Sequence, residues 1–279
     1  MEITAALVKQ LREETDAPMM ECKAALVEAN GDYDRAKEIL REKGKAAAAK
    51  RADRTTSAGV AKFAVTDDGK RAAGVVIESE TDFVSGNPEF QALADKLAKG
   101  MLDAKASGMD AVVDGATVAS HIEQAIALFR ENIVLKNSIY METPSGVIAI
   151  YNPHTGMSAS AVEISGDAKN LKETGFQVAI QTEANPPQFL TKEEVPSDII
   201  EKEIATETQR AVNEGKDLKI AEGIARGRVN KEYFQQQVLL EQPYYVDSKR
   251  SVSQFVSDEA KTGGGQIQIL KYVLLAVGS

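Results

Sequence analysis

Apolar residues in the first 44 positions recur at helical spacing in three short runs that are separated by turn residues. This pattern predicts three helices: one capped by Thr4, one beginning near Pro18, and one capped by Asp32 and ending at Gly44. The apolar faces expected for the three helices are Leu7, Val8 and Leu11; Met20, Ala24 and Val27; and Ala36, Ile39 and Leu40. The sequence therefore predicts a compact three-helix domain over residues 1–44.

The next run, KAAAAKRADRTTSAG, has no apolar stripe. It is rich in alanine and basic residues, which is typical of a connection rather than of a packed element. We interpret residues 45–58 as a basic linker that is helical at first and then extended, with Lys50, Arg51 and Arg54 in solvent.

Beyond the linker the pattern changes to that of strands and turns, and one arrangement occurs twice. A first hairpin is predicted over GVAKFAV, TDDGK and AAGVVIES, followed by a helix capped by Asn87 and a second helix over SHIEQAIALFRENIVL. A second hairpin is predicted over GVIAIYN and SASAVEIS, followed by the helix DAKNLKETGFQVAIQTE. The repetition predicts an α+β fold with duplicated subdomains, each an antiparallel sheet with helices.

A different segment interrupts the second subdomain. It contains two stretches with helical periodicity, separated near NEGKD, which predict an antiparallel helical hairpin. The closing run QIQILKYVLLAVGS is expected to complete the second sheet. The expected organisation is a three-helix domain at 1–44, a linker at 45–58, a first core subdomain at 59–140, a second at 141–184 and 235–279, and a helical-hairpin insertion at 185–234.

Composition narrows the class of protein. The net charge of −9 argues against a protein whose main ligand is nucleic acid. The single cysteine, Cys22, excludes an internal disulfide framework and is expected in the helical core. No apolar run is long enough to span a bilayer, and the N-terminus lacks the layout of a signal peptide. A soluble cytoplasmic protein without membrane contact is expected.

Residues that could carry chemistry are few. His121 is expected on the surface at a helix start, and His154 in the turn of the second hairpin. No His and Cys have metal-ligand spacing, and there is no phosphate-binding or nucleophile motif; TGGGQ leads into a strand, so a flexible turn is expected there. The sequence thus disfavours an enzyme and predicts no cofactor or metal. It indicates a protein that works through its surfaces.

One aromatic residue stands out in the stretch ESETDFVSGNPEF. Phe83 falls in the short connection between a buried strand and the helix at Asn87, next to Asp82. Such connections usually run over the surface, where a large apolar side chain has no partner. Either the ring folds back and anchors its own loop, or it is kept for a binding partner.

Two of these segments resemble a known family. ITAALVKQLREETDAPMMECKAALVEANGDYDRAKEILREKG resembles the ubiquitin-associated-type N-terminal domain of bacterial elongation factor Ts, and ESETDFV resembles that family's T-D-F-V motif. The later stretches PQFLTKEEVPSDIIEKE and LLEQPYYV are similar to its further landmarks, in the same order. The resemblance covers nearly the whole chain.

The resemblance implies a guanine-nucleotide exchange factor for elongation factor Tu, which neither hydrolyses nor directly binds nucleotide. In the family, the Asp and Phe of the motif enter the partner near its magnesium site. The N-terminal domain grips a helix of the partner, and the helical hairpin projects and can take part in a homodimer. The partner-binding residues that the resemblance implies here are Thr81, Asp82, Phe83, Val84, Arg12, Met19, Met20 and His154.

The chain departs from the family pattern at several points. Asp16–Pro18 stands where glycines are usual, which is expected to alter the angle between the first two helices. Ser85 and Gly86 come after the motif in place of a basic residue, and Met157 and Ser158 replace basic and aliphatic residues near His154. A further C-terminal helical module of some members is not expected. An alternative that the residues leave open is a non-catalytic adaptor or chaperone-like protein that binds peptides or ubiquitin-like ligands through the three-helix domain and the helical hairpin.

Overall fold

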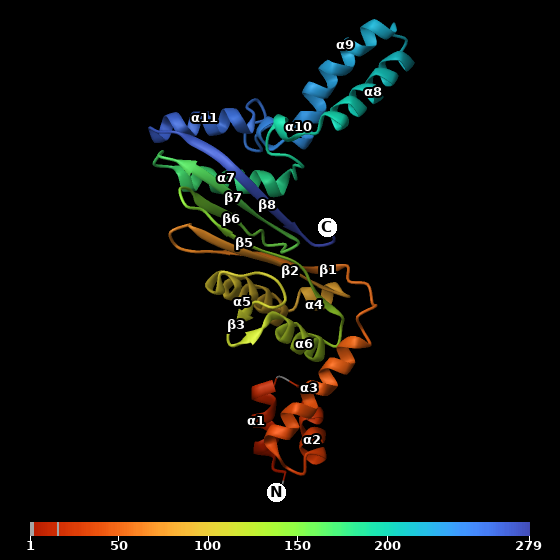
Figure 1. Ribbon diagram of the computed structural model, residues 1–279, viewed down its shortest axis with the longest axis vertical. Helices are drawn as coiled ribbons and strands as arrows, with labels where there is room; N and C mark the ends of the chain where they lie inside the picture. Colours follow the sequence, from red (N-terminus) through yellow and green to blue (C-terminus); the bar gives the residue numbers. More distant parts are fainter. Residues whose placement is uncertain (1–2, 16) are drawn as a thin grey trace.

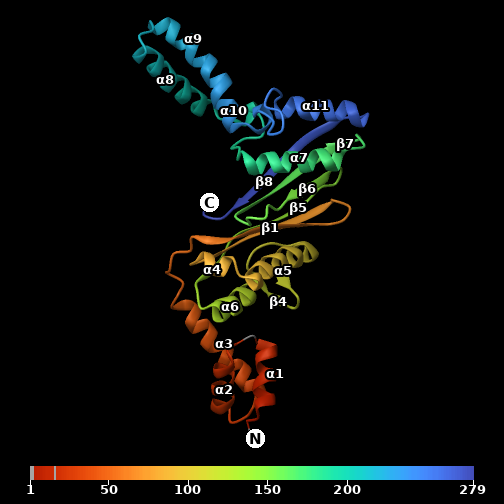
Figure 2. The same cartoon turned by 180° about the vertical axis from the view of Figure 1, so that it is seen from behind.

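The computed structural model describes residues 3–15 and 17–279 and shows an elongated molecule (Figure 1). Helices α1–α3 form one end, and the helices α8 and α9 project from the other. Between them lie two stacked sheets, each covered by helices on its outer side (Figure 2). This is the mixed α+β fold predicted from the sequence.

The N-terminal bundle consists of α1 (Ala5–Thr15), α2 (Met19–Glu28) and α3 (Tyr33–Ala49). Both predicted caps are present: Thr4 Oγ1 accepts a hydrogen bond from the Leu7 amide (3.2 Å), and Asp32 Oδ1 accepts one from the Arg35 amide (3.0 Å). The turn at Asp16–Pro18 includes Asp16, which lies outside the described residues.

Two expectations for the bundle were wrong. Helix α3 does not end at Gly44 but continues to Ala49, because the alanine-rich run favours helix. The buried face of α2 consists of Cys22, Ala25 and Leu26, not of Met20, Ala24 and Val27. Cys22 does lie in the core, as predicted.

The first α+β unit begins with an antiparallel sheet of three strands in the order β1 (Ala58–Val65), β2 (Arg71–Ser79) and β5 (Ile133–Glu142). Helices α5 (Pro88–Ala104) and α6 (Val118–Phe129) cover its outer face, with the small hairpin β3 (Val112–Val113) and β4 (Ala116–Thr117) between them. Asn87 caps α5, as predicted, by accepting a hydrogen bond from the Glu89 amide (2.8 Å).

The end of this unit differs from the prediction in two respects. The helix expected to reach Leu135 ends at Phe129, and the residues after it form the third strand of the sheet. His121 is not on the surface: it is buried, and its Nε2 lies 2.9 Å from the Val113 carbonyl oxygen, with which it forms a hydrogen bond. The ring thus contacts the small hairpin, since Val113 belongs to β3.

The second unit repeats the arrangement. Strands β6 (Val147–Tyr151), β7 (Ser158–Gly166) and β8 (Ile267–Ala276) form an antiparallel sheet, which the closing strand completes as predicted. Helix α7 (Leu171–Ala184) covers its outer face together with α11 (Val252–Gly263), a helix that the sequence did not lead us to expect. The inner faces of the two sheets pack against each other through Ala61, Phe63, Ala72, Val76, Met141, Ile148, Ala159, Ala161 and Leu275.

The predicted helical hairpin is formed by α8 (Ser197–Asn213) and α9 (Leu218–Arg228). A π-helical turn (η2, Val229–Tyr233) and α10 (Phe234–Gln237) lead back to the second unit, with short 3₁₀ turns at Lys192–Glu194 (η1) and Leu239–Glu241 (η3). A buried amide pair secures the base of the hairpin, where Gln181 Nε2 donates to Gln242 Oε1 (2.9 Å). No helix of the described part of the chain is long and apolar enough to cross a membrane.

Candidate partner-binding site

The T-D-F-V stretch forms a single helical turn, α4 (Asp82–Ser85), between β2 and α5. Thr81 is still extended at the N-cap position, and the turn is closed by hydrogen bonds from the Gly86 amide to Asp82 O (2.8 Å) and from the Asn87 amide to Val84 O (3.0 Å). Because Asn87 immediately caps the next helix, α4 cannot lengthen. The sequence therefore confines the motif to one short turn.

Phe83 lies on the outer side of this turn, with 88% of its side chain exposed. Its neighbour Val84 points inward and packs against the core of the first unit, since consecutive residues on a helix face different directions. The ring therefore does not anchor its own loop, and of the two alternatives raised by the sequence the first is wrong. Asp82 is also exposed, and its carboxylate has no hydrogen-bond or ion-pair partner within residues 3–15 and 17–279.

The backbone that carries α4 is firmly held. Thr81 donates two hydrogen bonds to the Glu131 carboxylate, from its amide to Oε2 (3.0 Å) and from its hydroxyl to Oε1 (2.6 Å). Ser79 Oγ donates to the Thr81 carbonyl oxygen (3.0 Å), and Gln91 Nε2 donates to the Ser85 carbonyl oxygen (2.7 Å). An exposed ring thus stands on an anchored turn.

The bundle exposes a second apolar surface. Met19, Met20 and Val27 on α2 are 50%, 73% and 56% exposed. Arg12 on α1 is exposed too, and no ion pair to it occurs among the described residues. Helices α2 and α4 lie on the same side of the long axis in both views (Figures 1 and 2). Val27, which the apolar periodicity placed in the core, is therefore a further candidate contact residue.

His154 is exposed in the loop between β6 and β7, as the sequence predicted for the hairpin turn. This loop reaches the first unit, where Gly156 O accepts a hydrogen bond from the Ala61 amide (2.8 Å). Gly156 also lies beside Gln91, the residue that holds the end of α4. The loop thus brings His154 and the half-exposed Met157 close to the part of the first unit that carries α4.

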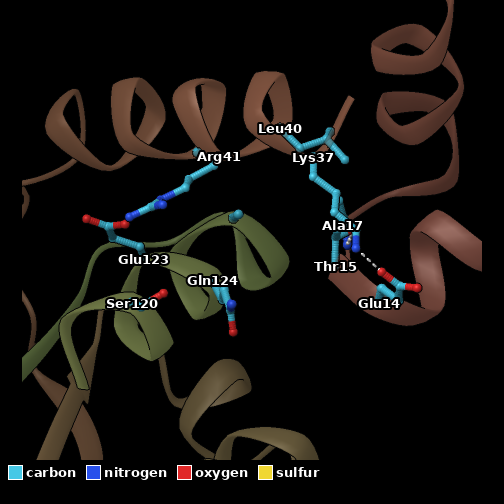
Figure 3. A pocket seen from close by; sticks show the side chains of 11 residues that line it. Glu14, Thr15, Ala17, Lys37, Leu40, Arg41, Ser120, Glu123 and Gln124 are labelled. Atoms are coloured by element: carbon cyan, nitrogen blue, oxygen red, sulfur yellow. Dashed lines mark hydrogen bonds and ion pairs between the residues drawn. The ribbon is translucent and has the colours of Figure 1, made fainter. Parts of the chain in front are cut away.

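The described residues contain no group of His, Cys, Asp and Glu that could hold a metal ion. A cavity of about 260 Å³ lies between the bundle and α6 (Figure 3), where Arg41 and Glu123 extend toward one another. On the bundle side of this cavity Glu14 forms an ion pair with Lys37, and the hydrogen bond from Lys37 lowers the pKa of the Glu14 carboxyl. The site consists of exposed side chains on fixed backbone, which suits protein binding.

Comparison with known proteins agrees with this picture. Residues 80–279 match the family model described as "Elongation factor TS". The chain is 37% identical over 278 residues to "Elongation factor Ts" of Clostridium botulinum (strain Alaska E43 / Type E3), covering 97% of this chain and 91% of the relative. It belongs to the elongation factor Ts family. The protein of that name from Deinococcus radiodurans is 40% identical over 256 residues (90% and 94% covered), and that from Caulobacter vibrioides is 35% identical over 291 residues (99% and 93% covered).

Membership of the elongation factor Ts family confirms the resemblance seen in the sequence, while the roles of the individual residues stay predictions. One departure from the family pattern has a local explanation. Ser85, which stands where a basic residue is usual, is buried and its hydroxyl donates to the Asp82 carbonyl oxygen (3.3 Å). It helps to close α4 and places no basic side chain at this position. The anchoring residue Glu131 was missed because its segment was interpreted as part of a helix.

Proposed function

We propose that this chain is a guanine-nucleotide exchange factor for elongation factor Tu and acts in translation elongation. Family membership supports the general activity. The observation that carries the mechanism is the 88% exposed ring of Phe83, held out on an anchored turn beside the exposed carboxylate of Asp82. The organisation into a partner-gripping bundle, two core subdomains and a projecting hairpin is part of the same proposal.

In the proposed mechanism, Phe83 enters an apolar pocket of the partner and Asp82 approaches the surroundings of the partner's Mg²⁺. Full burial of the ring supplies about 1.5–3 kcal/mol of binding free energy. Because GDP is held by phosphate-cradling backbone groups and by Mg²⁺, a disturbance of the metal's surroundings weakens nucleotide binding. The effect is reciprocal, so that GDP and the exchange factor displace each other. The chain itself changes no covalent bond.

The bundle supplies affinity in this proposal. Met19, Met20 and Val27 are flexible or compact apolar side chains that can adapt to a partner helix, and the exposed guanidinium of Arg12 can meet an acidic group. His154 adds a contact from the second unit. A homodimer through the hairpin is not required.

The test is release of a fluorescent GDP analogue from elongation factor Tu in the presence of Mg²⁺. We expect a large acceleration by the wild-type chain and a loss of about tenfold or more in Phe83→Ala. Phe176→Ala, which removes a 37% exposed ring from α7, is the matched control and should behave as wild type.

Three results would count against parts of the proposal. Acceleration that Phe83→Ala leaves intact would keep the function and reject the role of the ring. Absence of acceleration by the wild-type chain, with an active partner, would reject exchange. If the chain bound elongation factor Tu through the bundle and added GDP did not displace it, the result would favour the adaptor alternative.

A further inference from the structure

The three residues that join α6 to β5 contact three different parts of the molecule. Arg130 forms an ion pair with the bundle, Glu131 binds the residue before α4, and Asn132 binds the segment that leads from the bundle to β1. We propose that residues 130–132 are a positioning segment that fixes the bundle and α4 relative to each other. This inference rests on the proposed function, in which both parts meet one partner.

The contact with α4 is made by a charged group. Both carboxylate oxygens of Glu131 accept hydrogen bonds from Thr81, the N-cap residue of the turn that carries Phe83. Hydrogen bonds to an ionised acceptor are stronger than neutral ones and restrict direction. Glu131 therefore sets the position at which α4 begins.

The contact with the linker is buried. Asn132 is 4% exposed, and its Nδ2 donates to the carbonyl oxygens of Arg54 (2.8 Å) and Ala52 (3.4 Å). The backbone amide of Asn132 donates a hydrogen bond to Glu80 Oε1 (2.7 Å), and the same carboxylate oxygen accepts a hydrogen bond from Arg54 Nη1 (3.2 Å). Arg54 is exposed to solvent, as expected of the linker, but its hydrogen bonds also tie it to the first unit.

The contact with the bundle is made from an unusual backbone conformation. Arg130 is the C-cap of α6 with a left-handed φ of 59°, a position that glycine adopts at less cost. Its Nη2 lies 2.9 Å from Oε1 of Glu21, the residue after Met20 on α2. The ion pair therefore connects the exposed apolar face of the bundle directly to the residue next to Glu131.

The boundary between the bundle and the first unit contains both a helix contact and a cavity. The cavity between α3 and α6 is lined on its two sides by Leu40, Arg41 and Gly44 and by Ser120, Glu123 and Ala127 (Figure 3). A Cβ added at Gly44 would lie 4.0 Å from that of Ala127, so α3 and α6 are in van der Waals contact at this point. The polar contacts of residues 130–132, such as Arg130–Glu21, act together with this helix contact to fix the angle between the bundle and the first unit.

The test separates two steps of exchange by measuring GDP release against the concentration of the factor. Arg130→Gly keeps the left-handed turn and removes only the ion pair, so we expect the half-saturating concentration to rise about threefold to fivefold with the maximal release rate unchanged. Glu131→Gln keeps the shape of the side chain but removes one acceptor. We expect it to lower the maximal rate about tenfold with the half-saturating concentration unchanged.

Two controls distinguish positioning from general stability. The charge swap Glu21→Arg with Arg130→Glu should restore the half-saturating concentration to within about twofold of wild type. Arg35→Ala removes an exposed arginine whose ion pair with Glu38 lies within α3, and it should have no effect on either parameter. A general loss of stability would not raise only the half-saturating concentration in Arg130→Gly and lower only the maximal rate in Glu131→Gln.

A distance measurement tests the placement without the partner. Spin labels at Lys23→Cys on α2 and Lys99→Cys on α5, in a Cys22→Ala background, report the separation of the bundle and the first unit. We expect a narrow distribution that broadens in Arg130→Gly and narrows again in the charge swap. The proposal is overturned if the distance distribution of Arg130→Gly is the same as that of wild type. It is also overturned if that distribution broadens while the exchange kinetics of Arg130→Gly stay those of wild type. If the wild-type chain did not accelerate exchange, the proposed function would fail, and the distances alone would decide the placement.

Discussion

The two α+β units have closely similar sheets but differ in the path that the chain takes as it leaves the central strand. Both sheets are antiparallel with three strands, and the pairing of each central strand with the last strand shifts register at one place, between Val76 and Ile77 in β2 and between Glu163 and Ile164 in β7. A helix then packs on the outer face in each unit, α5 in the first and α7 in the second. The shared part is the scaffold.

The difference is the helical turn α4. In the first unit the chain leaves β2 and forms a turn that exposes Phe83 before α5 begins, whereas in the second it passes from Gly166 to α7 without an exposed aromatic residue. Gly166 has a φ of +143°, and a Cβ there would lie 1.9 Å from the Gln266 carbonyl oxygen, so this connection requires glycine. Because the second unit folds around its sheet without such a turn, the fold does not require the exposed ring.

The comparison predicts that replacing each of two phenylalanines in neighbouring elements, α4 and α5, has very unequal effects on stability. Phe90 is fully buried beneath the first sheet and makes an edge-on contact with Phe129, so Phe90→Ala should lower the free energy of unfolding by about 3–5 kcal/mol. Phe83→Ala should change it by less than about 0.5 kcal/mol, since the ring is already in solvent. Urea unfolding measures both; a large loss of stability in Phe83→Ala would mean that α4 belongs to the core after all.

The same comparison shows why the sequence predicted some strands and missed others, β5 among them. The two hairpins have alternating or buried apolar runs on either side of turn residues, a pattern that few other structures produce. Strand β5 comes after α6 without a glycine or proline, because Arg130 makes the left-handed turn at which glycine is usual. Helix α11 does have a signal in the sequence, the capping box formed by Ser251 and Gln254.

The candidate site was only partly predictable for a related reason. The T-D-F-V motif identified Phe83, but the sequence could not determine which of two adjacent apolar residues in a single turn faces outward. On α2, Met20, Ala24 and Val27 form as good a helical stripe as the face that is buried. Hydrophobicity does not distinguish a core face from a binding face. The contact between Thr81 and Glu131 joins segments 50 residues apart and has no local signal.

A second prediction concerns the packing between the two sheets. Gly74 in β2 and Ala161 in β7 occupy equivalent positions, because each lies two residues before the last residue ahead of the register shift. The second unit accommodates an alanine side chain at this position, whereas the first unit has no room for one. A Cβ at Gly74 would lie 2.5 Å from a ring carbon of Phe63 and 2.6 Å from Leu275 Cδ1. Gly74→Ala should therefore destabilise the protein by about 1–3 kcal/mol in urea unfolding.

The matched control for this substitution is Gly223→Ala in α9. No atom lies within 4 Å of a Cβ added there, and alanine is the better helix former, so stability should rise by about 0.5–1 kcal/mol. If Gly74→Ala were equally harmless, the two sheets would pack less tightly than the structure indicates.

The smallest expected effect is a loss in the free energy of unfolding at alkaline pH that arises in the second unit. Its outer layer contains Tyr244, which is buried and stacks on Phe255 with ring centroids 4.1 Å apart, whereas the outer layer of the first unit has Phe90 and Phe129 and no buried tyrosine among the described residues. Burial raises the pKa of Tyr244 to about 12 from an ordinary value of 10.0. As the pH rises above 10, the unfolded chain loses this proton first, so the stability that the neutral phenol contributes falls until the folded state also ionises.

The difference between wild type and Tyr244→Phe isolates this contribution, because all other titrating groups are common to both. Between about pH 9 and pH 11 the wild type should lose about 1.4 kcal/mol more free energy of unfolding than the variant. Tyr245→Phe is the control in the neighbouring position: burial raises the pKa of this tyrosine too, but its side chain is 41% exposed, and the loss should remain close to that of wild type. Equal alkaline losses in wild type and Tyr244→Phe would show that the second unit opens enough to hydrate this ring, and the two units would then differ in rigidity as well as in α4.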